Sequence, residues 1–498
     1  MCGIIGIAKA EKNAVLDVYD GLMMLQHRGQ DSAGIVTFDG QKFHERRGAG
    51  LVLDVFTQEK IKELVGRWGL GHCRYTTAGN FASVHEAQPF FVNAPLGIFL
   101  IHNGNLTNTE ALRERIQNKY RRHLRTDSDT EVLLNVFADK IYQVMKSDPE
   151  KSLPDTVFAA TTKLMKRVTG AYSVITLIDQ VGLLAFRDPH GIRPLVFGKK
   201  ETTKGTEWIF ASEDVAIKTL GYEVVRDVAP GEAILINKEG EMTSHQCVPG
   251  QLNPCIFEYI YLARPDSMIN KISVYKTRLR MGASLAKQIK KANLDIDSVM
   301  PVPDSGRPLA LQIAHDLGVK YREGLVKNRY IARTFIMPGQ VKRKNSIRQK
   351  LNTIELEFRN RNVLLVDDSI VRGNTIKKII ELCRSAGAKK VYVASGAPPV
   401  RGLDVYGVDI PTRTELVAHG LTTEEIRKVV NADALFYQTV EELVEAARAG
   451  NPEIKKFHTG MFDGKYPTPE VTPEYLDKVE FEGRGAELSN GKISLPNF

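Results

Sequence analysis

Short apolar runs separated by polar loops dominate the first half of the chain. We predict strands at these runs: Gly3–Ala8, Ala33–Phe38, Gly97–His102, Tyr172–Ile178 and Ala233–Ile236. Two longer stretches, Val15–Leu25 and Asp129–Met145, are predicted as helices, and in the second the apolar positions recur at helical spacing. Many strands with a few segregated helices indicate a layered α/β domain with a largely antiparallel sheet.

The pattern loosens after Asn237. The segment Lys238–Pro254 carries two glycines and two prolines, which is typical of a connection between domains. We therefore predict a first domain over residues 2–240 and a connection over residues 241–257.

The second half alternates strand and helix. Strands are predicted at Ser298–Val302, Val363–Val366 and Lys390–Ser395, and helices at Leu309–Leu317 and Ile376–Ser385, with Gly387 placed to cap the last helix. This alternation predicts a parallel sheet over residues 258–456, with ligands at the carboxyl ends of the strands. Residues 457–498 are predicted as a surface tail with one short helix starting near Thr472.

Composition narrows the class of protein. A chain of 498 residues with 43% hydrophobic content exceeds the size of most single cores, so two domains are expected. The chain contains no apolar run of roughly twenty residues and no signal-like N-terminus, so we expect a cytoplasmic protein without a membrane partner. The formal charge of +9 suits an anionic ligand without specifying it.

The five cysteines, an odd number, are scattered and form no Cys-x-x-Cys pair. This distribution favours reduced thiols over a disulfide framework. A zinc or iron–sulfur site assembled from distant residues stays an open alternative.

The first chemically suggestive feature is the amino end. Cys2 follows Met1 and precedes Gly3 and a predicted strand, so loss of one residue would place a thiol beside a free α-amine. Such an amine has a pKa near 8 and can accept the thiol proton. A cysteine at the second position is common, however, so the residues around it must show whether Cys2 is a nucleophile.

Three polar, glycine-bearing loops lie at predicted strand ends: residues 26–34 (QHRGQDSAG), 71–79 (GHCRYTTAG) and 102–105 (HNGN). With MCGIIGI at the start, they resemble the glutaminase domain of N-terminal-nucleophile amidotransferases over roughly the first half of the chain. The resemblance implies a four-layer αββα fold in which Cys2 attacks the glutamine amide. It also implies that Asn103 and the Gly104 N–H hold the oxyanion.

The same resemblance implies a set of glutamine-binding residues: Arg28, Arg74, Thr76 and Asp129. Arg74 has the alternative of a structural ion pair. Asp129 has that of a helix cap, because Ser128–Glu131 precedes an amphipathic run. We expect His72 and His102 to organise loops, since the terminal amine already supplies a base.

The segment VLLVDDSIVRGNT at residues 363–375 joins an apolar strand to two carboxylates and a glycine-containing turn before a helix. Such a turn can cradle a phosphate while its carboxylates hold ribose hydroxyls and magnesium; a solvated turn is the alternative. The segment resembles the phosphoribosyl pyrophosphate (PRPP) motif of type I phosphoribosyltransferases. The implied PRPP-binding residues are Asp367, Asp368, Ser369, Val371, Arg372, Gly373, Asn374 and Thr375.

Two further segments fit the same ligand. The segment Pro301–Arg307 would form the pyrophosphate loop, placing Ser305 with Asp367 and Asp368 around one magnesium ion per subunit. Lys327–Pro338 and the basic run after it resemble a mobile loop that closes over PRPP. The cations expected against pyrophosphate are Lys327, Arg333 and Lys350. A nuclear signal or nucleic-acid patch is the competing interpretation of this run, but no RNA-binding module accompanies it, so no nucleic-acid partner is expected.

Together the two halves resemble the glutamine phosphoribosylpyrophosphate amidotransferase family through about residue 460. The resemblance implies a homotetramer or homodimer inhibited by purine nucleotides, and an apolar ammonia passage lined partly by Ile331, Phe335 and Ile336. Some members of the family that the chain resembles bind an iron–sulfur cluster through cysteines that include a C-terminal Cys-x-x-Cys. No cysteine follows Cys383 here, so we expect no such cluster. Two alternative functions stay open: an amidotransferase that aminates another acceptor, and a non-catalytic regulator that senses PRPP.

Overall fold

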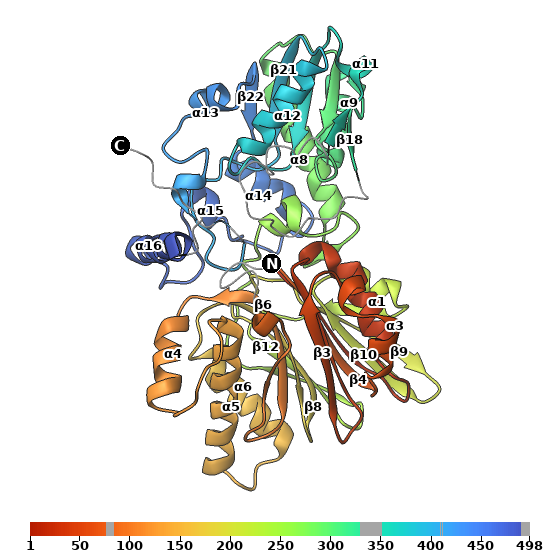
Figure 1. Ribbon diagram of the computed structural model, residues 1–498, viewed down its shortest axis with the longest axis vertical. Coiled ribbons are helices and arrows are strands. Elements are labelled where there is room, and N and C mark those ends of the chain that lie inside the picture. The colour runs from red at the N-terminus through yellow and green to blue at the C-terminus, as the bar shows by residue number, and fades with distance from the viewer. Residues whose placement is uncertain (76–83, 329–350, 409, 411, 490–498) are drawn as a thin grey trace.

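The computed structural model describes residues 1–75, 84–328, 351–408, 410 and 412–489, with side chains to residue 481. Figure 1 shows two lobes in sequence order. The N-terminal half forms the lower lobe and the C-terminal half the upper lobe, with the amino end of the chain at their junction.

The N-terminal domain consists of two antiparallel sheets. The first has the order β11-β9-β10-β1-β4-β2-β3 and the second β13-β12-β8-β7-β6-β5. The strands of the first sheet are β1 Gly3–Ala8, β2 Ser32–Phe38, β3 Phe43–Ala49, β4 Trp68–Arg74, β9 Val196–Thr202, β10 Gly205–Ala211 and β11 Glu223–Asp227. Those of the second are β5 Phe90–Val92, β6 Ile98–Leu106, β7 Gly170–Ile178, β8 Gly182–Arg187, β12 Glu232–Asn237 and β13 Met242–Gln246.

Helices cover the outer face of each sheet. The helices on the first sheet are α1 Val15–Leu25, α2 Val52–Val55, α3 Gln58–Lys62 and α7 Asp214–Thr219; those on the second are α4 Thr109–Asn118, α5 Asp129–Ser147 and α6 Leu153–Met165. Strand β1 shows how the sequence builds these layers, since Ile5 and Ile7 pack toward the α1 side and Ile4 packs between the sheets. The predicted αββα arrangement is confirmed.

The C-terminal domain contains a parallel sheet in the order β17-β16-β20-β21-β22. Its strands are β16 Ser298–Pro301, β17 Lys320–Tyr321, β20 Asn362–Asp367, β21 Lys390–Ser395 and β22 Ala434–Tyr437. Its helices are α8 Val274–Lys291, α9 Arg307–Leu317, α12 Asn374–Ser385, α13 Thr423–Val430 and α14 Val440–Arg448. Within β20, Leu364 and Val366 pack with α8 and α9, whereas Val363 and Leu365 pack with α12 and α13. A strand buried on both faces needs apolar residues throughout, which explains its sequence.

The domain junction differs from the expectation. Strand β13 pairs with β12, so the first domain's sheet continues to Gln246, past the predicted boundary at residue 240. The junction then leads into η3 Glu258–Leu262, a π-helix.

The expected surface tail is also partly wrong. His458, Met461 and Phe462 are buried in the second domain, and His458 forms an isolated bridge with Cys255. The expected helix is present as α16 Pro473–Ser489, preceded by α15 Gly460–Asp463. The remaining short elements are η1 Gln26–Arg28, η2 Val84–Glu86, β14 Met268–Ile269, β15 Ile272–Ser273, β18 Leu325–Lys327, β19 Leu351–Thr353, α11 Glu355–Phe358 and η4 Arg413–Glu415.

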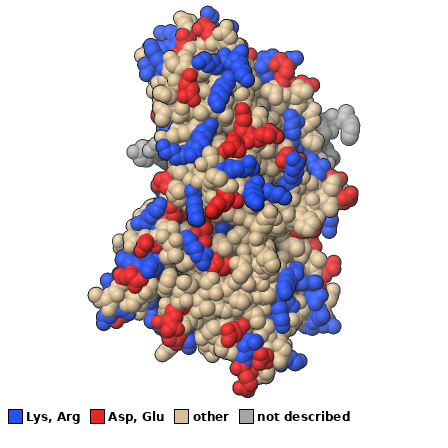
Figure 2. Space-filling view, turned by 180° about the vertical axis from the view of Figure 1, so that it is seen from behind, with Lys and Arg blue, Asp and Glu red and all other residues tan. Residues whose placement is uncertain are grey.

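The surface carries mixed charge. Figure 2 shows Lys and Arg over both lobes, interspersed with Asp and Glu across much of the visible face. Among the helices of the described ranges, none has the length and apolarity to cross a bilayer.

Candidate active sites

A pocket of about 450 Å³ lies at the amino end of the first domain. It brings together Cys2, Arg74, Gly104 and Asp129, which come from four separate segments of the chain. Tyr475, Lys478 and Val479 of α16 also line it. No motif indicates this last contribution, because α16 reaches the pocket only through the packing of the two domains.

Asn103 lies beside Cys2 and is hydrogen-bonded to its backbone. The backbone N–H of Cys2 donates to Asn103 Oδ1 at 3.1 Å, and Asn103 is fully buried on β6. Its Nδ2 has no hydrogen-bond partner in the described part of the chain. An unpaired buried amide donor costs free energy, so its presence beside Cys2 indicates that a ligand oxygen accepts a hydrogen bond from it during function.

Gly104 has a backbone conformation that other residues rarely adopt, with φ of +150°. A β-carbon there would lie 2.0 Å from the Ala171 carbonyl oxygen, so glycine is required by space as well. The second domain approaches the same residue: a β-carbon at Gly407 would lie 3.0 Å from the Gly104 carbonyl oxygen. The domain junction therefore lies directly against this edge of the pocket.

Arg74 and Asp129, two of the residues predicted to bind glutamine, line the pocket and also contact other protein groups. Arg74 forms an ion pair of 2.5 Å with Glu86, so the structural alternative applies to it as well. Asp129 accepts a hydrogen bond from the Leu106 N–H at 3.1 Å. It is the first residue of α5 but not its cap, since the Ser128 hydroxyl accepts from the Thr130 N–H. The cap interpretation of Asp129 was therefore wrong.

The other predicted residues of this site behave differently. Arg28 does not line the pocket and is 3% exposed, with its guanidinium donating to the carboxylates of Glu213 and Glu258. Thr76 lies outside the described residues. Burial lowers the pKa of His72 to about 3, so its imidazole stays neutral.

The second site forms where β16 and β20 lie side by side in parallel. The loops after these strands meet at the same edge of the sheet. Asp368 accepts hydrogen bonds from Ser305 and, at 2.6 Å, from Ser369. The structure thus brings Ser305 and Asp368 together, and Asp367 Oδ1 accepts a hydrogen bond from the Asp368 N–H at 2.9 Å.

The electrostatics of this pair suit a cation. Burial and the neighbouring Asp368 carboxylate raise the pKa of Asp367 well above its ordinary value, and burial raises the pKa of Asp368. The half-buried Asp367 carboxylate and the buried Asp368 carboxylate repel each other, and a divalent cation relieves that repulsion. The oxygen ligands of Asp367, Asp368 and Ser305 are the type that magnesium prefers.

The turn after the carboxylates starts α12. Gly373 occupies the cap position with φ of +73°, and a β-carbon there would lie 2.9 Å from a Val417 methyl group. Asn374 and Thr375 are exposed at the first turn, where backbone N–H groups can bind an anion. Arg372 is paired with Glu415 at 2.6 Å.

The cations predicted against pyrophosphate are only partly described. Lys327 Nζ donates to Asp304 at 3.3 Å, and Arg307 pairs with Asp304 at 2.7 Å. Arg333, Lys350, Ile331, Phe335 and Ile336 lie outside the described residues.

Cys255, Asp404 and His458 form a third cluster, whose possible ligand atoms lie within 4.8 Å of one another. His458 Nε2 lies 2.9 Å from Asp404 Oδ2, and Arg193 lies 3.4 Å from the other oxygen of that carboxylate. The Asp404 side chain is thus already engaged by protein groups. The absence of an iron–sulfur cluster stays a prediction.

A cysteine pocket on an αββα fold, joined to a parallel sheet with an acidic phosphate loop, defines an amidotransferase fused to a phosphoribosyltransferase. Family models agree: one described as glutamine amidotransferase domain matches residues 72–219, and one described as phosphoribosyl transferase domain matches residues 272–397.

Full-length relatives are more specific. The amidophosphoribosyltransferase of Pseudomonas aeruginosa is 51% identical over 96% of this chain and 95% of its own length. That of Saccharomyces cerevisiae is 44% identical over 96% and 95%, respectively. The solved glutamine PRPP amidotransferase of B. subtilis, complexed with ADP and GMP, has a TM-score of 0.83 and 35% identity, covering 95% of this chain and 98% of that one. The chain belongs to the amidophosphoribosyltransferase family and is an enzyme of the glycosyltransferase type.

Proposed function

We propose that the chain hydrolyses glutamine at Cys2 and passes the ammonia to C1 of PRPP, yielding 5-phosphoribosylamine, glutamate and pyrophosphate. This reaction is the first committed step of purine synthesis. The observation that carries the proposal is the Asn103 side chain, which accepts from the Cys2 N–H while its buried Nδ2 has no partner in the described chain.

Loss of Met1 turns the Cys2 nitrogen into an α-amine that takes the thiol proton. The thiolate attacks the glutamine carbonyl carbon, and Asn103 Nδ2 with the Gly104 N–H stabilises the oxyanion. The protonated α-amine returns its proton to the departing nitrogen, so the intermediate expels neutral ammonia and leaves a thioester that water hydrolyses to glutamate. Arg74 binds the substrate carboxylate and Asp129 its ammonium group.

In the second domain, Asp367 and Asp368 bind the ribose hydroxyls, and the backbone and hydroxyl groups of residues 369–375 bind the 5-phosphate. Ser305 and the two aspartates would hold magnesium, which supplies positive charge to the pyrophosphate group. Lys327, with Arg333 and Lys350, neutralises pyrophosphate as the C1–O bond breaks and ammonia attacks the cationic carbon.

Ammonia must cross the domain junction without meeting water, which would protonate it. The contacts at that junction are short: Asn105 Nδ2 donates to the Val405 carbonyl at 2.9 Å, and Thr107 donates to Glu470 at 2.6 Å. These contacts support a passage that starts beside Gly104.

Three broader features accompany the proposal. The enzyme works in the cytoplasm, assembles as a homotetramer or homodimer, and is inhibited by purine nucleotides. The last feature is supported by the ADP and GMP named for the B. subtilis structure.

To test the proposal, purified protein is incubated with glutamine, PRPP and magnesium, and then with each of the three omitted in turn, while glutamate and pyrophosphate are measured. Glutamate and pyrophosphate should form in equal amounts with the complete mixture, and pyrophosphate should still form when ammonia replaces glutamine. Ammonia-dependent pyrophosphate release excludes an amidotransferase with another acceptor. A protein that is inert under both conditions would instead be a PRPP-sensing regulator.

A further inference from the structure

Cys2 lies just outside the sheet that follows it. The first residue pair between β1 and β4 is Gly3 with Cys73, so the backbone of Cys2 has no place in the strand ladder. Two side chains hold it instead: Asn103 accepts from its N–H at 3.1 Å, and Arg28 Nε donates to its carbonyl oxygen at 3.2 Å. The position of the Cys2 backbone therefore depends in part on where Arg28 is held.

Two carboxylates hold Arg28. Glu213 accepts from Nη1, and Glu258 accepts from Nη2 with both oxygens, at 2.8 and 3.0 Å. Arg28 and Glu258 are 3% and 1% exposed, so this ion pair is shielded from water. Both carboxylates raise the pKa of Arg28, against the effect of its burial. A buried charge that loses one partner is strongly destabilised, so Arg28 would shift if Glu258 changed.

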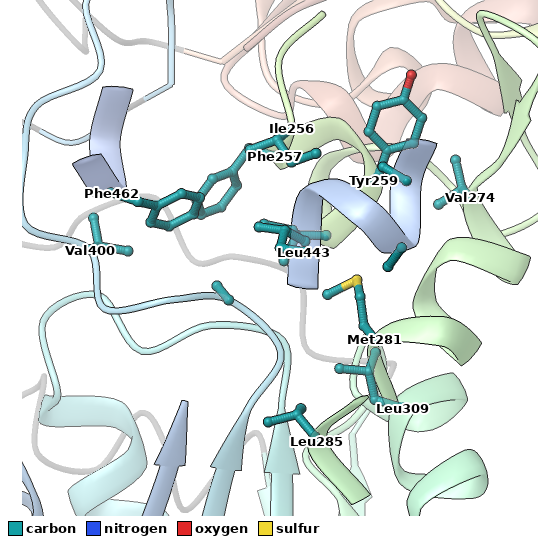
Figure 3. Packing of buried hydrophobic residues seen from close by; sticks show 14 of the residues in the cluster. Ile256, Phe257, Tyr259, Val274, Met281, Leu285, Leu309, Val400, Leu443 and Phe462 are labelled. Carbon is teal, nitrogen blue, oxygen red and sulfur yellow. The ribbon is translucent and has the colours of Figure 1, made fainter. Parts of the chain in front are cut away.

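Glu213 belongs to the first domain, but Glu258 is the first residue of the π-helix η3 at the start of the second. Figure 3 shows Tyr259 of η3 packed beside Val274, with Met281 and Leu443 nearby. π-Helical turns are rare in proteins and occur frequently at functional sites.

A second buried arginine fixes the other side of η3. Arg278 of α8 donates to the Tyr259 carbonyl at 3.1 Å and to the Ala263 carbonyl at 2.8 Å. The backbone of η3, which carries Glu258, is thus held by α8 of the second domain.

We propose that Glu258 is a positioning residue of the glutaminase site, contributed by the second domain, which aims Cys2 by holding Arg28. This inference rests on the proposed function. In this interpretation Arg28 binds the backbone of Cys2 and not the glutamine substrate. Glutamine hydrolysis then depends on the position of η3.

The test is Glu258→Gln, which keeps the side chain's shape and removes its charge. Misplacing a nucleophile by about 1 Å can cost roughly 100-fold in rate. We expect the kcat of glutamine hydrolysis to fall about 10- to 100-fold, with KM for glutamine and ammonia-dependent synthesis both unchanged within about twofold. A diazoketone analogue of glutamine should inactivate the variant with a lower maximal rate but at an unchanged half-saturating concentration, in parallel with the lower kcat and unchanged KM.

Glu258→Asp, which keeps the charge but withdraws it from Arg28, provides a second variant should the amide fold poorly; a kcat loss with unchanged KM is again expected. The matched control is Glu232→Gln, which removes a carboxylate bound by Arg226 at 2.6 and 2.7 Å within the first domain and should leave the glutaminase kcat unchanged.

Three results would overturn the inference while leaving the proposed function intact. These are wild-type kcat in both Glu258 variants, a raised KM with unchanged kcat, and an equal fall of glutamine- and ammonia-dependent synthesis. Wild-type protein that does not hydrolyse glutamine would instead refute the proposed function.

Discussion

Replacing Asn103 with alanine should separate catalysis from stability. The substitution removes Nδ2, the proposed oxyanion donor, and one such donor is worth about 100- to 1000-fold in kcat, or roughly 2.7–4 kcal/mol. It also removes the acceptor for the Cys2 N–H, a hydrogen bond worth about 0.5–1.5 kcal/mol. Against that loss, the unpaired buried amide disappears, which relieves about 1–3 kcal/mol. At their midpoints the relief exceeds the loss by about 1 kcal/mol, so these two effects together should not lower the free energy of unfolding.

The assay measures glutamate release, ammonia-dependent pyrophosphate release and urea unfolding on the same preparation. We expect glutamate release to fall by at least about 100-fold, while the other two measurements change little. Asn135→Ala is the control, because Asn135 Nδ2 donates to the Glu131 carbonyl at 2.9 Å. It should lose about 1 kcal/mol of stability and no glutaminase activity. A variant of Asn103 that keeps more than a tenth of wild-type glutamate release would refute the role of this amide.

Three further predictions follow from the charges and thiols. Asp368→Asn should abolish ammonia-dependent synthesis by at least about 100-fold, measured as pyrophosphate release, while the fold is retained by circular dichroism. Iodoacetamide at neutral pH should modify Cys2 first in peptide mass spectra, because Cys73, Cys255 and Cys383 are buried, with pKa values raised to about 12; early modification of Cys73 would contradict this. The His458 and Arg193 side chains hold the pKa of Asp404 at about 2, so its stabilising contribution is present above pH 4 and is lost as pH falls toward 2. Urea unfolding across that range should be less pH-dependent in Asp404→Asn; equal pH dependence would show that Asp404 contributes little.

Local patterns predicted most of the scaffold. The bounds of β1, α1 and β21 match the expectation, because each is a clear apolar run or helical repeat bounded by polar or glycine residues. β13 was missed because its segment Met242–Gln246 is exposed and lacks apolar alternation, and only pairing with β12 makes it a strand.

The candidate site was predictable where its residues lie in short motifs. Cys2, Asn103 and Asp368 could be located from the loops that carry them. The role of Arg28 could not, because its partners Glu213 and Glu258 are far away in sequence and no motif links them. The same reason hid the contribution of α16 to the pocket, since packing of distant segments leaves no periodic signal.

Transfer of nitrogen between the two sites tests the central claim most directly. The enzyme would receive amide-labelled glutamine, PRPP and magnesium in the presence of excess unlabelled ammonium at neutral pH. If ammonia passes internally from Cys2 to the Asp367–Asp368 site, most of the phosphoribosylamine will carry the label. If the labelled fraction of the product equals that of the ammonium in solution, internal transfer is contradicted. If the product never carries the label, the proposed use of glutamine nitrogen for phosphoribosylamine is contradicted.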